Sequence, residues 1–122
     1  MRIYNYENII PAGTVLNANI NGKAMQALNM MGVAVQVVVT GTPTGTFSLQ
    51  GSNDAITNSD PTYVPTNWTT LSSSNTAFSA AGVALWNVPD MYFTWIRLVY
   101  TDGSSGSSTA VVAHSNLNAK GF

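Results

Sequence analysis

The chain has 122 residues, enough for one domain with a hydrophobic core and too few for two ordinary domains, and 45% of its residues are apolar. Charged residues make up only 7%, where soluble domains average about 25%, and the net charge is -1. A net charge this small produces only a weak electrostatic field, which excludes strong attraction to nucleic acid or anionic lipid. Neither is expected as a partner. Solubility must depend on Ser, Thr and Asn, which form about a third of the chain.

Two further features limit the class of protein. The chain has no Cys, which excludes disulfides and thiolate metal sites. Its longest apolar region, Ala24 to Val39, is interrupted by Gln26, Asn29 and Gln36, so it falls short of the ~18 apolar residues that indicate a membrane span. The first ten residues do not combine a basic segment with a hydrophobic stretch, so no signal peptide is expected.

The first ten residues, MRIYNYENII, have two interpretations. Tyr4 and Tyr6 share one face of an extended segment that Pro11 ends. The segment is either the first strand of its own sheet or an arm, Met1 to Ile10, that pairs with the edge of a neighbouring chain. In the second case, Arg2, Tyr4 and Tyr6 are candidate interface residues.

Alternation of apolar and polar residues dominates the next part of the chain. VAVQVVV places Val at positions 33, 35, 37 and 39, and GTFSLQGS places Phe47 and Leu49 on one face, so both runs are predicted strands. TGTPTG between them supplies a turn, which predicts a hairpin. Further strands are predicted near residues 3–8, 15–20, 67–73, 77–80, 83–86, 92–101 and 109–115. Only Lys23 to Met31 has a pattern compatible with a short helix.

The segment from Tyr92 to Thr101 is apolar on both faces, which is typical of a central strand covered on both sides. The second face is covered either by the rest of the domain or by another subunit. Arg97 is the exception within this strand. A guanidinium there needs a carboxylate or several carbonyls nearby. It either packs its stem, with its head at the sheet rim or paired with an Asp, or it binds a ligand, and it is also a candidate interface residue.

Many short strands separated by turn signals predict an all-β fold, a single-domain antiparallel β-sandwich over residues 1–122, of jelly-roll type.

An inventory of reactive groups argues against catalysis. His114 is the only His, and the five carboxylates are scattered along the chain: Glu7, Asp54, Asp60, Asp90 and Asp102. No nucleophile elbow, zinc motif, phosphate loop or dinucleotide fingerprint is present. We therefore expect no enzyme activity and no cofactor, with His114 in a structural role at the end of a strand.

Two binding sites can be considered. Asn53, Asp54, Asn58 and Asp60 offer oxygen ligands of the kind that Ca²⁺ prefers, but their spacing does not match an EF-hand, and Asn and Asp are also ordinary turn residues. Three aromatic residues could form a platform for a glycan, or could simply pack in the core or at its rim: Tyr63, Trp68 and Trp86.

Several segments together resemble small β-rich structural proteins of bacteriophage virions. These are GTFSLQGSND, NWTTLSSS, ALWNV, WIRLVYT, a Gly/Ser hairpin and the ending NLNAKGF, within Val33 to Phe122. In that group Gly41, Gly45 and the GSND turn shape the first hairpin. The resemblance implies a capsid cement or decoration protein, a vertex protein, or a spike or fibre domain, and it implies no catalytic residue.

The scarcity of charge agrees with an assembly protein, because interface cores are poor in charged residues and rich in aromatic residues and Met. We expect a homo-oligomer, most simply a trimer on a three-fold capsid site, that also contacts the major capsid protein and is located in the virion. The alternative is a receptor- or carbohydrate-binding domain of a spike or tail fibre, and a more distant one is a cellular carbohydrate-binding module.

Overall fold

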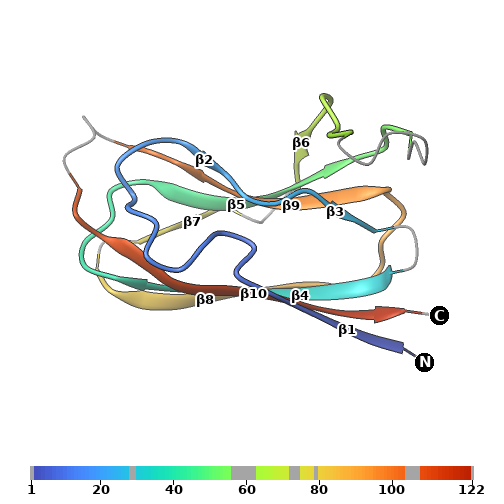
Figure 1. The fold of residues 1–122 in the computed structure, drawn as a ribbon, viewed down its shortest axis with the longest axis horizontal. Helices are drawn as coiled ribbons and strands as arrows, with labels where there is room; N and C mark the ends of the chain where they lie inside the picture. Colours follow the sequence, from blue (N-terminus) through green and yellow to red (C-terminus); the bar gives the residue numbers. More distant parts are fainter. Residues whose placement is uncertain are drawn as a thin grey trace.

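The computed structural model describes residues 2–27, 30–55, 63–71, 75–78, 80–103 and 108–121. Every regular element in these ranges is a β-strand, and the strands form two antiparallel sheets that lie face to face (Figure 1). The predicted all-β sandwich is therefore confirmed, whereas its jelly-roll form remains a prediction. No helix within these ranges is long and apolar enough to cross a membrane.

The first sheet, sheet A, has the strand order β1-β10-β4-β8. Its strands are β1 (Arg2–Glu7), β10 (Val111–Gly121), β4 (Met30–Thr40) and β8 (Gly82–Val88). Each neighbouring pair is antiparallel, and the β10–β4 register shifts twice, between Val112 and His114 and between Lys120 and Gly121. The first residues are thus a strand of the chain's own sheet, the first of the two interpretations of that segment.

The second sheet, sheet B, has the order β2-β9-β5-β6. Its long strands are β5 (Thr46–Ser52) and β9 (Trp95–Thr101). Four strands of two residues line its edges: β2 (Ile20–Asn21) and β3 (Met25–Gln26) pair with β9, whereas β6 (Thr69–Thr70) and β7 (Thr76–Ala77) pair with β5. The central position of β9 explains why its sequence is apolar on both faces.

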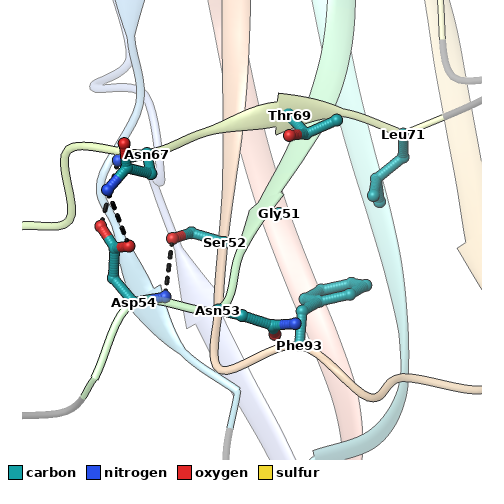
Figure 2. Close-up of a pocket in the computed structure, with 8 residues that line it drawn as sticks. All are labelled: Gly51, Ser52, Asn53, Asp54, Asn67, Thr69, Leu71 and Phe93. Atoms are coloured by element: carbon teal, nitrogen blue, oxygen red, sulfur yellow. Dashed lines mark hydrogen bonds between the residues drawn. The ribbon is translucent and has the colours of Figure 1, made fainter.

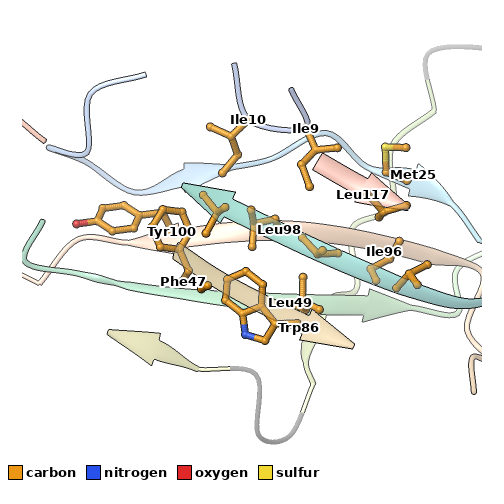
Figure 3. Packing of buried hydrophobic residues seen from close by; sticks show 14 of the residues in the cluster. Ile9, Ile10, Met25, Phe47, Leu49, Trp86, Ile96, Leu98, Tyr100 and Leu117 are labelled. Atoms are coloured by element: carbon orange, nitrogen blue, oxygen red, sulfur yellow. The ribbon is translucent and has the colours of Figure 1, made fainter. Parts of the chain in front are cut away.

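The core lies between the two sheets (Figure 3). Sheet A contributes the four odd-numbered valines of β4, all 2% exposed or less, and sheet B contributes Phe47, Leu49, Ile96, Leu98 and Tyr100. Trp95 and Val99 lie on the opposite face of β9 and are also buried. Strand β9 is therefore covered on both faces within a single chain, as its pattern predicted.

The predicted hairpin between the strands at residues 33–39 and 46–49 is wrong. Strand β4 belongs to sheet A and β5 to sheet B, so TGTPTG crosses from one sheet to the other. The physical reason is burial, because the valines of β4 and Phe47 bury each other only when they face one another across the sandwich. Gly41 adopts a φ of 86°, which glycine tolerates, and helps the chain turn. The Gly/Ser hairpin that the resemblance implied is also wrong, because the strands on either side of it, β9 and β10, lie in different sheets.

Two other expectations near the N-terminus are also wrong in the described residues. The candidate helix from Lys23 to Met31 contains β3, and β4 already begins at Met30. The predicted strand over residues 15–20 is reduced to a single bridge from Val15 to Val111 and the first residue of β2. This part of the chain follows the sandwich edge, where pairing with β9 and β10 overrides its weak local preference.

Candidate functional site

The outer face of sheet A carries most of the exposed large apolar side chains in the described part of the chain. Ile3 is 76% exposed, Leu85 68%, Val83 58% and Met31 49%. Alternation explains the placement of Ile3, Val83 and Leu85, because their neighbours Tyr4, Ala84 and Trp86 point inward. Met31 faces outward where the register of β4 with β10 shifts. An exposed apolar set concentrated on one sheet face is a typical mark of an interaction surface.

Between these apolar side chains the face is lined by neutral amides. The strand register aligns Asn5, Asn118, Ala34 and Asn87 in one row across all four strands. Asn5 donates a side-chain hydrogen bond to Asn118 within this row. Glu7 and Lys120 are the charged residues that β1 and β10 place on this face. The surface is therefore mostly neutral and can approach a partner with little charge to desolvate.

A groove of about 560 Å³ runs over one end of this face. Its floor is low because Gly32 and Ala34 on the central strand β4 are small, while Ile3 and Met31 stand beside them. Asn87, Asn118 and Lys120 supply the polar part of the lining. An apolar floor with neutral amides at its rim suits a protein segment better than a highly charged ligand.

The predicted interface residues of the first strand lie mainly on its other face. Tyr4 and Tyr6 are half-buried and pack against the core. Whether they contact a partner remains a prediction, as does a contact by Arg2. Ile3, Asn5 and Glu7 are the residues of this strand that face outward. The sequence holds a sign of this outward surface, because RIYNYE and GVALWNV both carry apolar residues on each of their two faces. It does not show which face is outward, since Tyr is found both in cores and at surfaces.

Arg97 lies on the outer face of sheet B, half-buried beneath Trp68. Its Nε donates a hydrogen bond of 2.9 Å to Gln50 Oε1, and its Cζ lies 4.2 Å from the centroid of the Trp68 ring. The guanidinium was expected to lie near a carboxylate or several carbonyls. It contacts one amide oxygen and the face of an aromatic ring instead. Partial burial lowers the pKa of the Arg97 guanidinium from its ordinary value. The Arg97 guanidinium is thus held by contacts within the chain. A contact of Arg97 with a partner stays a prediction.

The three aromatic residues of the glycan hypothesis do not form one platform. Trp86 is buried on the inner face of sheet A (Figure 3). Tyr63 and Trp68 lie over sheet B, where Tyr63 is 6.1 Å from Trp95 by ring centroids and Trp68 donates from Nε1 to the Pro65 carbonyl. A platform of all three is therefore wrong, because alternation in β8 turns Trp86 into the core while the other two cover β9.

A second cleft, of about 450 Å³, lies at one end of the sandwich (Figure 2). Its apolar wall is formed by Phe93 and Leu71, which flank Gly51, and Asn53 also lines the cleft. Asp54 and Asn67 close the opposite rim, where Asp54 accepts hydrogen bonds from Thr66 N, Asn67 N and Asn67 Nδ2 at 2.9–3.1 Å. The Asp54 carboxylate thus fixes the segment that leads into β6.

These contacts predict a pH response at Asp54. Hydrogen bonds from Asn67 and Thr66 hold the pKa of this carboxyl below its usual value of 3.8. The folded state then favours the ionised form, so the stabilisation is complete above pH 3.8 and is lost as the pH falls through the lower folded pKa. We expect the amide resonances of Thr66 and Asn67 to titrate in an NMR experiment with a midpoint below 3.8, and to stop titrating in Asp54→Asn. A midpoint at or above 3.8 would contradict the contacts.

Of the four residues of the calcium hypothesis, Asn53 and Asp54 lie in the described part of the chain. Asp54 already accepts three hydrogen bonds, and Asn58 and Asp60 lie outside the described residues. Within the described ranges, no three His, Cys, Asp or Glu side chains gather closely enough to hold a metal ion.

His114 is exposed on the outer face of sheet A, opposite Val38 and beside a register shift.

Comparison with protein-family models finds no match to this chain, and a search of curated proteins finds none either.

Proposed function

We propose that the chain is a non-enzymatic structural protein of a bacteriophage virion, which decorates or cements the capsid through contacts with its own copies and with the major capsid protein. The observation that carries the proposal is the mostly neutral outer face of sheet A with its exposed Ile3, Met31, Val83 and Leu85. The resemblance of the sequence to virion proteins supports the part of the proposal that places the chain in a bacteriophage particle. No catalytic residue and no cofactor is assigned.

The composition of this face supports assembly in physical terms. Burying apolar surface is worth about 25 cal/mol per Å², so covering four large side chains contributes several kcal/mol before the cost of association. Removing Lys and Glu from an interface core avoids their desolvation. In this chain charged residues are scarce throughout, at only 7% of the total. We expect a homo-oligomer, with a trimer suited to three-fold capsid sites.

A receptor- or carbohydrate-binding domain of a spike or fibre is the second candidate. The cleft lined by Phe93 favours it, since an aromatic ring and the Asn53 amide in one cleft can stack on and hydrogen-bond a sugar (Figure 2). Loss of glycan binding in Asn53→Ala, with particle attachment unchanged, would support this candidate.

Substitution of Ile3 tests the assembly function. Ile3→Glu places a charge on the outer face of sheet A, at an exposed site where the fold tolerates it, so we expect attachment to particles that lack this chain to weaken at least about tenfold. Tyr92→Glu is the matched control, because Tyr92 is 91% exposed and is not in a strand of sheet A. Cosedimentation with particles measures both. Equal attachment of Ile3→Glu and wild type, or no attachment of wild type, would refute the proposal.

A further inference from the structure

The four edges of the two sheets are protected to very different degrees. A sheet edge exposes unpaired backbone N–H and C=O groups, and natural proteins protect edges with short strands, charges, Pro or bulges. Both edges of sheet B consist of two-residue strands. The β1 edge of sheet A is longer but carries Arg2 and Glu7.

The fourth edge, β8, has none of these protections. Its seven residues, GVALWNV, contain no charge and no Pro, and their register with β4 runs without a shift. In the described part of the chain β8 pairs with β4 alone. Its outward side chains include Val83 and Leu85, two of the most exposed apolar residues. Such an edge is a ready template for another strand.

We propose that the β8 edge pairs with the β8 edge of a second copy of this chain, antiparallel and about a two-fold axis, so that sheet A continues from one copy into the next. The contact is made by backbone hydrogen bonds along the edge and by side-chain pairs on both faces of the joined sheet. This inference deepens the proposed function and rests on it, because it names one self-contact of the assembly.

The pattern of β8 selects one register. Residues directly opposite each other in an antiparallel pair share a face, so outward residues must oppose outward residues. Centring the pair on Leu85 is the register that pairs all seven residues. It places Leu85 opposite Leu85 of the second copy and Val83 opposite Asn87. On the inner face it places Ala84 opposite Trp86, a small side chain against a large one.

A second copy fits this edge better through its own β8 than through its β1. Pairing with β1 would bring Arg2 and Glu7 against an uncharged strand and remove them from water with no opposite charge to meet. It would also be a head-to-tail contact, which adds copies without limit unless the rotation closes. The β8–β8 contact is complete with two copies. The expected trimer would therefore use a different surface, and β8 would join copies in pairs.

Charge exchange at Leu85 tests the two-fold contact. The substitutions Leu85→Lys and Leu85→Glu each place two like charges opposite one another only if residue 85 faces itself. Because the β8 contact joins copies in pairs, we expect wild type to sediment at an even multiple of 12.9 kDa, twice this mass if β8 is the one contact in solution. Each variant alone should self-associate at least about tenfold more weakly, and an equimolar mixture of the two variants should regain the paired mass. Tyr92→Lys, at an exposed residue outside the strands of sheet A, should associate as wild type does.

Three results would overturn the contact. They are a wild type that stays monomeric, variants that pair as tightly as wild type, and a mixture that remains monomeric although both variants are folded by circular dichroism. Particle attachment is measured on the same samples. If attachment persists without pairing, the β8 contact is wrong and the proposed function stands, whereas loss of attachment in wild type removes the proposed function itself.

Discussion

Phe47→Ala is expected to lower the free energy of unfolding by about 3–5 kcal/mol, the usual cost of removing a buried aromatic ring. Phe47 is fully buried between the sheets and packs against two other rings. Its centroid lies 4.9 Å from that of Tyr100 and 5.7 Å from that of Phe78, which it meets edge to face. The substitution leaves a cavity at the point where β5, β7 and β9 meet, and the rings around it lose their partner.

Urea unfolding followed by circular dichroism measures this loss. Tyr92→Ala is the matched control, since it removes an aromatic ring of similar size that is 91% exposed, and its cost should be within about 0.5 kcal/mol of zero. A loss below about 1 kcal/mol in Phe47→Ala would show that this ring is not part of the core.

Alternation in the sequence was sufficient to predict the strands β4 and β5 but not their partners, and the strand predicted over residues 109–115 falls short of β10, which ends at Gly121. The odd valines of β4 and the Phe47–Leu49 pair of β5 were correctly assigned to buried faces. Whether two successive strands lie side by side or face each other depends on which arrangement covers both apolar faces, and this is a property of the whole chain. A turn sequence such as TGTPTG fits either outcome, so the hairpin was predicted wrongly.

The candidate surface was harder to predict than the fold. Tyr4 and Tyr6 share one face of the first strand, as the sequence indicated, but that face packs on the core and Ile3 faces outward. The two faces of a strand are equivalent in the sequence when both carry apolar residues, as in RIYNYE and GVALWNV. The long edge of β8 could not be anticipated, because edge positions follow from strand order.

Salt is expected to leave the assembly intact, whereas urea is expected to take it apart. Contacts through the outer face of sheet A and β8 contain few charges, so shortening the Debye length from about 10 Å at 0.1 M salt to about 3 Å at 1 M should leave self-association and attachment unchanged. Urea weakens the burial of apolar and peptide groups. It should therefore release the protein from particles and separate its copies at concentrations below the unfolding transition.

Sedimentation of particles carrying the bound protein, over a salt series and over a urea series, tests the neutral apolar contact most directly. Circular dichroism on the same samples establishes that the fold is intact at each point. The account predicts that the protein stays with the particles throughout the salt series and leaves them in urea while still folded. Release by moderate salt alone would mean that the few charges hold the assembly, among them Arg2, Lys23, Arg97 and Lys120, and would contradict the account.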